Sequence, residues 1–215
     1  MPPKKTYVYI DGFNLYYGSL KRTPYKWLNV HRMCELLLTQ NKIDRIYYFT
    51  AQVSGTPSNP DSPQRQLAYI RALRTIPILQ IVQGHFLVDR VFLRKADDSG
   101  DVEVIRMKEK QSDVNLASQL LWDAHCNSFE CAVLISGDSD FLSPVQIVKE
   151  RFRKDVGILD PQRSGTPNSP LNKMATFYKP IRQGVLHESQ FPMSLTDKTG
   201  TFYKPESWFA EPSRP

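Results

Sequence analysis

Short β-type runs alternate with helical patterns along most of the chain. The two can be told apart because strand side chains alternate with a period of two, whereas a helix face recurs every three to four residues. Strands are predicted at residues 7–10, 43–50, 78–83, 131–135 and 156–159. Helices are predicted at residues 29–38, 64–74, 112–126 and 142–152. Strands that alternate with helices predict an α/β fold around a doubly wound, mostly parallel sheet.

Two regions depart from this alternation. Two β-like runs, 86–95 and 102–107, flank the turn-rich segment 96–101 and predict an inserted β-hairpin. Beyond Asp160 the chain becomes rich in proline, with short helices expected at 171–175 and 182–188 and a short strand at 177–178. We expect one domain over 1–188 and a C-terminal extension over 189–215, its last dozen residues being a proline-rich extended arm or disordered. The pentapeptide Thr-Phe-Tyr-Lys-Pro occurs twice, at 176–180 and 201–205, and we assign it no function.

Composition narrows the class of protein. Of 215 residues, 40% are hydrophobic and 23% charged, which excludes a wholly disordered chain, a collagen and a coiled coil. The net charge of +6 is compatible with nucleic-acid binding and equally with an ordinary basic surface. No apolar run approaches the ~20 residues that span a bilayer, so no membrane association is expected. The N-terminus lacks the pattern of a signal peptide, and three cysteines without Cys-x-x-Cys spacing suit a reducing cytosol; we therefore expect a cytoplasmic location.

Acidic residues follow two of the predicted core strands. Asp11 comes directly after the strand at 7–10, and Asp138 and Asp140 follow the strand at 131–135. Asp113 opens the helix at 112–126. Ligands of open α/β sheets bind beyond the carboxyl ends of the strands, where the strand order reverses. If the two strands are neighbours, the four carboxylates converge on one cleft.

Four carboxylates in one cleft repel one another and raise their own pKa values unless a cation neutralises them. Oxygen ligands without His or Cys favour Mg²⁺ or Mn²⁺ over zinc, and such a site can activate water and hold a phosphate. Each acid also has a structural explanation. Asp11 could shape a turn, Asp113 could favour the positive end of its helix, and Asp138 or Asp140 could cap the next helix.

Three segments resemble the NYN family, whose nuclease-like domains are related to PIN domains and distantly to flap nucleases. They are residues 9–15 (YIDGFNL), 110–117 (KQSDVNLA) and 135–141 (ISGDSDF), in the family's order, and the resemblance spans about residues 6–187. The resemblance implies a PIN-like Rossmannoid three-layer sandwich with an acidic cluster that binds Mg²⁺ or Mn²⁺. It also implies hydrolysis of RNA phosphodiester bonds.

The resemblance assigns roles to individual residues. Asp11, Asp113, Asp138 and Asp140 would be metal ligands, and Asn14 would help to hold metal-bound water or phosphate. Many relatives carry a further acid at the place of Gln119; here Asp123 comes one turn later, which puts a second metal site in question.

Several basic and aromatic residues are candidates for contacts with RNA. Lys110, Lys108 and Arg71 are expected to contact the RNA backbone, and Lys110 lies just before Asp113 in its motif. The aromatic residues Tyr16, Tyr17 and Trp27 either stack an unpaired base or pack in the core.

The leading hypothesis is a metal-dependent endoribonuclease that acts on single-stranded or loop RNA. One alternative is a non-catalytic RNA-binding or regulatory module, and another is a structure-specific DNA nuclease. A phosphatase ranks last, because Phe13 occupies the place of its usual second acid. A homodimer or a protein partner is left open, with the hairpin edge and the proline-rich arm as candidate contact surfaces.

Overall fold

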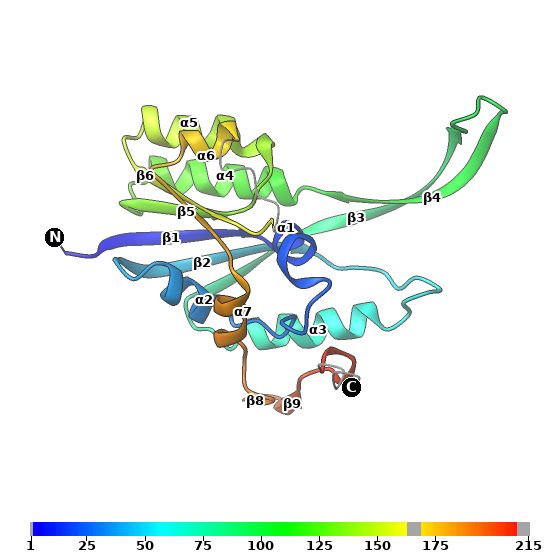
Figure 1. Cartoon of the computed structure of the whole chain (residues 1–215), viewed down its shortest axis with the longest axis horizontal. Helices are drawn as coiled ribbons and strands as arrows, with labels where there is room; N and C mark the ends of the chain where they lie inside the picture. The colour runs from blue at the N-terminus through cyan, green and yellow to red at the C-terminus, as the bar shows by residue number, and fades with distance from the viewer. Residues whose placement is uncertain (1, 163–168, 210–215) are drawn as a thin grey trace.

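A seven-stranded sheet runs through the molecule in the order β4-β3-β2-β1-β5-β6-β7 (Figure 1). The computed structural model describes residues 2–162 and 169–209, without the side chains of 85–89 and 105–110. The strands are β1 (Lys4–Asp11), β2 (Asn41–Ala51), β3 (Leu79–Arg94), β4 (Asp101–Lys110), β5 (Cys131–Ile135), β6 (Asp155–Asp160) and β7 (Phe177–Pro180). Six of them are mutually parallel and β4 is antiparallel to β3, which confirms the predicted α/β class and mostly parallel sheet.

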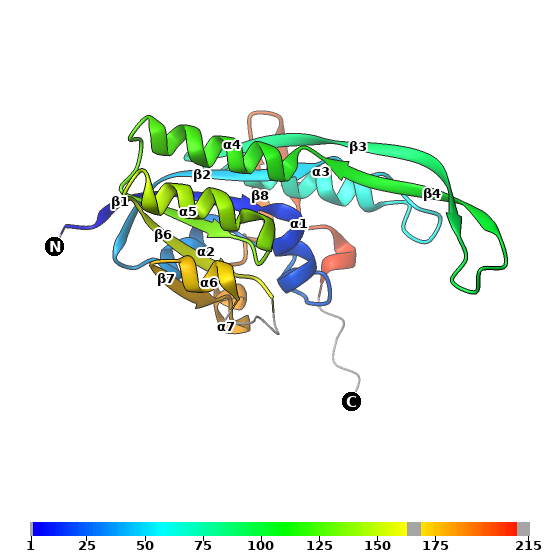
Figure 2. The ribbon, with the colours of Figure 1, turned by 90° about the horizontal axis from the view of Figure 1, so that it is seen from above.

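Helices cover both faces of the sheet and make three layers (Figures 1 and 2). On one face lie α4 (Ser112–His125), α5 (Leu142–Glu150) and α6 (Pro170–Met174). On the other lie α2 (Val30–Leu37), α3 (Ser62–Leu73) and α7 (Gln183–Glu188). Short segments complete the set: α1 (Gly12–Leu15), η1 (Tyr16–Leu20), η2 (Ser139–Phe141) and η3 (Glu206–Trp208).

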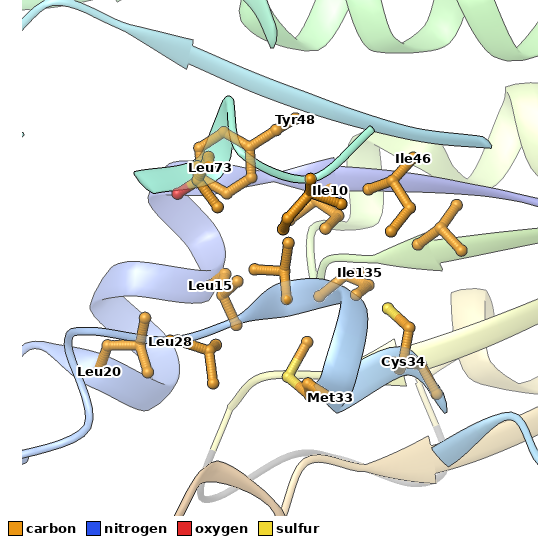
Figure 3. Close-up of a cluster of buried hydrophobic side chains, with 14 of the residues drawn as sticks. Ile10, Leu15, Leu20, Leu28, Met33, Cys34, Ile46, Tyr48, Leu73 and Ile135 are labelled. Carbon is orange, nitrogen blue, oxygen red and sulfur yellow. The ribbon is translucent and has the colours of Figure 1, made fainter. Parts of the chain in front are cut away.

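The core consists of two apolar clusters, one on each face of the sheet. Successive strand side chains point to opposite faces, so Val8 and Ile10 join the cluster under α2 and α3 while Tyr9 joins the cluster under α4 and α5. Figure 3 shows part of the first cluster, including Ile10, Met33 and Ile135. Every residue of β5 is buried, as expected for a central parallel strand with helices on both sides.

The predicted hairpin is confirmed, but its first strand is not separate from the strand expected at 78–83. β3 is one continuous strand that changes partner along its length: Leu79–Gly84 pairs with β2, and the remainder pairs with β4. β2 ends at Ala51, opposite Gly84, so the outer part of β3 has β4 as its neighbour. This two-stranded arm projects beyond the rest of the sheet (Figures 1 and 2).

The chain beyond residue 188 contributes to the core. Residues 194–203 form a small hairpin, β8 (Ser194–Asp197) and β9 (Gly200–Tyr203), which the sequence did not predict. Phe191 and Phe202 pack on Trp27, whose indole N–H donates to the Pro192 carbonyl at 2.7 Å. The domain boundary at 188 stays a prediction.

The repeated pentapeptide lies in two different settings. Its first copy forms edge strand β7, with Phe177 against Gly157, and its second overlaps β9, with Phe202 buried. Among the described residues, no helix is both long and apolar enough to cross a membrane.

Candidate active site at the carboxyl ends of β1 and β5

The strand order reverses between β1 and β5. Both strands are parallel and adjacent, with Ile10 opposite Ile135, so the loops that follow them leave from the same edge of the sheet. Asp11 ends β1, Asp138 lies in the loop after β5, and Asp140 lies in the short helix η2 that follows this loop. β1 and β5 are therefore neighbours, which is the condition under which the carboxylates were predicted to converge. Ligands of α/β proteins bind at such a reversal of the strand order.

Asp11 caps α1 at the edge of the sheet where β1 and β5 end. Its Oδ1 accepts the backbone N–H of Asn14 at 2.9 Å, so the predicted structural role in the turn is real and coexists with a role in the site. The helix can start at once because the next residue is glycine. A Cβ on Gly12 would lie 2.7 Å from the Phe49 carbonyl oxygen and 2.8 Å from the Tyr48 ring. Only glycine allows α1 to pass this close to β2.

Ser136 joins the two strand ends. This buried hydroxyl donates to Asp11 Oδ2 at 3.2 Å and accepts the backbone N–H of Asp138 at 3.1 Å. The Asn14 side-chain carbonyl accepts the Gly137 N–H at 3.1 Å, a second tie between α1 and the β5 loop. Asp138 in turn caps η2 by accepting the Asp140 N–H at 3.0 Å. Sequence reasoning assigned Ser136 no role, although a serine directly after a core strand was a signal that could have found it.

Asp113, in the first turn of α4, lies near enough to Asp11 and Asp138 for their charges to interact. Gln111, with φ of 81° in the left-handed region, turns the chain from β4 into this helix. Burial raises the pKa of Asp11 to about 6; its hydrogen bonds oppose the rise, and the charges of Asp113 and Asp138 add to it. Partial burial and the charges of Asp138 and Asp140 likewise raise the pKa of Asp113. The four predicted carboxylates thus form one electrostatically coupled group.

The donor set fits a hard divalent cation in its chemistry. All candidate ligands are oxygens, and mutual repulsion of the carboxylates is what a cation would relieve. Among the side chains that the structure describes, which exclude those of 85–89 and 105–110, no three His, Cys, Asp or Glu residues are grouped closely enough to hold a metal ion between them. Mg²⁺ keeps several waters and is usually bound through only one or two carboxylates, so binding of this ion does not require three grouped acids.

Asp123 does not belong to this site. It is buried on α4, where its Oδ2 accepts the Tyr9 hydroxyl at 2.8 Å and its Oδ1 accepts from Gln119 Nε2 at 3.1 Å. It therefore does not replace the acid that many relatives carry at the place of Gln119. Asp160, at the end of β6, is also buried, and its oxygens accept from Gln162 N–H and the Tyr178 hydroxyl.

The residues expected to contact RNA lie in different settings. The side chains of Lys108 and Lys110 are outside the described residues. The Arg71 guanidinium pairs with both oxygens of Asp197 at 2.7 and 2.8 Å and lies 4.1 Å from the centre of the Phe202 ring. Arg71 thus holds the β8–β9 hairpin, and its role in RNA binding stays a prediction.

The three aromatic residues considered for base stacking differ in how exposed they are. Trp27 is fully buried among aromatic side chains, so its packing role is the one realised, whereas Tyr17 is 60% exposed. Tyr16 is partly buried against the core.

Comparison with known proteins agrees with the fold described above. The chain matches the NYN domain model over residues 5–180. It is 29% identical over 241 aligned positions to 6-hydroxy-3-succinoylpyridine 3-monooxygenase HspA of Pseudomonas putida, covering 98% of this chain and 77% of the relative. Among solved structures it resembles a protein of unknown function from Vibrio parahaemolyticus, with a TM-score of 0.53 and 20% identity over 84% of this chain and 94% of that one. That likeness concerns the fold.

Proposed function

Because the chain belongs to the NYN domain family, a family of nuclease-type domains, we propose that it is a metal-dependent ribonuclease. We expect it to cleave internally, in single-stranded or loop RNA. The observation that carries the proposal is the coupled group of Asp11, Asp113, Asp138 and Asp140 at the strand-order reversal. The reaction adds water across one bond: the water oxygen bonds to phosphorus, the bond from phosphorus to the leaving oxygen breaks, and that oxygen takes up a proton.

The chain's own residues supply the positions for this chemistry. Asp11, Asp113, Asp138 and Asp140 would surround a largely hydrated Mg²⁺ or Mn²⁺, with one or two of them bound to it directly and the others through its waters; the ion would lower the pKa of water and neutralise charge that develops on the phosphate. Asn14 Nδ2 has no hydrogen-bond partner among the described residues, and it can donate to a phosphate oxygen while its carbonyl holds the Gly137 N–H. Ser136 keeps Asp11 and the β5 loop in register. These groups sit on strand ends and helix starts, which hold a site more precisely than loops do.

The direct test is an incubation of purified protein with labelled single-stranded RNA and the matching DNA, with Mn²⁺, Mg²⁺ or EDTA. Asp11→Asn and Asp140→Asn should each lower RNA cleavage by at least ~100-fold, because even groups that only support metal ligands cost 10–100-fold when lost. The matched control is Asp44→Asn, which changes an acid on β2 that pairs with Lys42 at 3.3 Å. It should cleave like the wild type.

The outcomes separate the alternatives. Cleavage retained by both site variants, with fold intact by circular dichroism, would refute the proposed site. RNA binding that survives EDTA with no product would favour a regulatory RNA-binding module. Cleavage of DNA but not RNA would favour the structure-specific DNA nuclease.

A second candidate function rests on the Pseudomonas relative, which is named a monooxygenase and matches nearly the whole chain. The test is incubation with 6-hydroxy-3-succinoylpyridine, dioxygen and a reduced nicotinamide as electron donor. Loss of the pyridine substrate together with dioxygen uptake would favour this activity. An unchanged substrate, beside metal-dependent RNA cleavage, would favour the nuclease.

A further inference from the structure

An aromatic and basic stripe runs along α1 and η1, directly after Asp11. The rings of Phe13 and Tyr17 are stacked, with centroids 6.4 Å apart and planes 22° apart. One turn further, the Lys21 ammonium lies 4.7 Å from the centre of the Tyr17 ring. Tyr17 is 60% exposed, although a tyrosine ring of this size is normally packed for most of its area.

The opposite side of the same segment anchors it firmly. Leu15 and Leu20 are buried in the first core cluster, where Figure 3 shows them beside Leu28. The Ser19 hydroxyl donates to the Pro161 carbonyl at 2.5 Å, and a Cβ on Gly18 would lie 2.9 Å from that same oxygen. The segment is π-helical, a rare geometry that is frequent at functional sites. These contacts fix the backbone of η1, so the exposed ring of Tyr17 projects from a well-anchored segment.

A cavity opens beside this ring. It measures about 300 Å³ and is lined by Tyr17, Gly18, Ser19, Lys21 and Arg22. Lys21 and Arg22 are both exposed, and neither forms an ion pair with any carboxylate whose side chain the structure describes. The lining therefore offers one aromatic face and two uncompensated cations. A flat apolar ring beside cations is the combination by which proteins bind unpaired bases and their phosphates.

The cavity lies close to the carboxylates. α1 starts at the end of β1, where Asp11 caps it (Figure 1). At a rise of 1.5 Å per residue, Tyr17 lies about 9 Å along the helix from Asp11. Pro161, which clamps η1, follows Asp160, and the Asp160 and Gln162 side chains also border Gly137 of the β5 loop. A polymer held at the carboxylates could extend along α1 and η1 as far as this cavity, whereas a small free anion would have no need of the ring.

We propose that Tyr17, Lys21 and Arg22 form a subsite for single-stranded RNA beside the carboxylates. A base takes the place of the Lys21 ammonium on the face of the Tyr17 ring, and Lys21, moved aside, and Arg22 hold the adjoining phosphates. The subsite rests on the proposed ribonuclease function for its substrate class. It accounts for a preference for unpaired RNA, because a base within a duplex cannot stack on a protein ring.

The test measures binding without cleavage. A fluorescent single-stranded oligoribonucleotide is titrated with protein in EDTA and followed by anisotropy at several salt concentrations. Tyr17→Ala should weaken binding roughly 5- to 100-fold, and Tyr17→Phe, which keeps the ring, should bind within about twofold of wild type. Lys21→Gln should lower the slope of log K against log salt by about 0.7, the value of one phosphate contact on a single strand.

Matched controls separate this from general surface effects. Tyr203 is 67% exposed on β9, and Lys42 is the second residue of β2, at the amino end of that strand. Tyr203→Ala and Lys42→Gln should leave both affinity and salt slope unchanged. In addition, Tyr17→Trp should show quenching of its added fluorescence on RNA binding, relative to the wild type.

The proposal is overturned if Tyr17→Ala binds as tightly as wild type, or if an RNA duplex binds as tightly as the single strand. Absence of any RNA binding by wild type at low salt also overturns it. A wild type that binds RNA with the predicted Tyr17 and Lys21 effects, yet cleaves nothing with Mn²⁺ or Mg²⁺, would refute the proposed ribonuclease function and leave the subsite standing.

Discussion

Replacing Asp11 with asparagine should stabilise the metal-free protein at alkaline pH. Asp11 is only 7% exposed and lies near Asp113 and Asp138, and burial with these charges raises its pKa to about 6. A carboxyl group whose pKa is raised by folding destabilises the folded state when it is ionised. Asn removes that charge and keeps one carbonyl oxygen, which can still accept the Asn14 N–H that starts α1.

The size of the effect follows from the pKa. The rise from 3.8 to about 6, at 1.36 kcal/mol per pH unit, makes ionised Asp11 cost about 3 kcal/mol of folding free energy. Below pH 3.8 the group is protonated in both states and the cost vanishes; above pH 6 it is present in full. Wild-type stability from this group therefore falls as pH rises from about 4 to 6. The weaker hydrogen bonding of the neutral amide offsets about 1.5–2 kcal/mol of this cost, so the variant should be roughly 1–1.5 kcal/mol more stable than wild type at pH 8.

The assay is urea unfolding in EDTA at pH 4 and pH 8, followed by tryptophan fluorescence, with wild type and Asp11→Asn compared at each pH. A second variant, Asp197→Asn, provides a control of opposite sign. Hydrogen bonds from Arg71 and Thr199 hold the pKa of Asp197 well below its usual range. Its stabilisation is therefore present above about pH 4 and lost as pH falls further, so Asp197→Asn should destabilise the protein at pH 8.

The reasoning about Asp11 would be refuted by an Asp11→Asn variant that is less stable than wild type at pH 8. An equal difference in unfolding free energy at pH 4 and pH 8 would refute it too, because the cost of ionisation must appear between the two values. Either result would mean that the carboxylate is more hydrated, or better compensated, than its position at the end of β1 indicates.

Three further results are expected. Mg²⁺ or Mn²⁺ at about 100 times its Kd should raise the melting temperature of wild type by roughly 5–10 °C and leave Asp11→Asn unchanged; calorimetry with and without EDTA measures this. Gly157→Ala should destabilise the protein by about 1–3 kcal/mol, because a Cβ there would lie 2.1 Å from the Phe177 ring, and adding Phe177→Leu in urea unfolding should restore most of the loss. Tyr9→Phe should cost about 1–3 kcal/mol in the same assay, because buried Asp123 then loses its hydroxyl donor; no change would mean that water replaces it.

Much of the fold was predictable because its signals are local. β5 was predicted with its observed bounds, because a short apolar run between turn residues is typical of a buried central strand in an α/β fold. Asn29 was expected to start a helix, and its side chain does cap α2 by accepting the Arg32 N–H. The acids after β1 and β5 could be predicted to share a cleft only on the condition that these strands pair, which they do.

Other features depend on partners far away in the chain. Tyr17 and Trp27 were equal candidates for base stacking, but residues 191–208 fold back over Trp27 and bury it. In the sequence Arg71 cannot be told from any other surface cation. Its partner, Asp197, lies 126 residues further along the chain and is brought to it only by the fold. Asp123 lies one turn beyond Gln119 on the same helix, α4, so its spacing alone does not exclude it from the site. It lies outside the site because its carboxylate is buried and hydrogen-bonded to the Tyr9 hydroxyl.

The sequence by itself determined the α/β class, the NYN family and the identity of the strand-end carboxylates, because each is encoded in a contiguous pattern of side chains. Only the tertiary structure decided which aromatic ring and which cations remain exposed beside those carboxylates. Burial, charge coupling and hydrogen-bond satisfaction are set by groups that the chain brings together over more than a hundred residues. Ser136 illustrates this: one hydroxyl holds two strand ends in register, and its partner Asp11 lies 125 residues away.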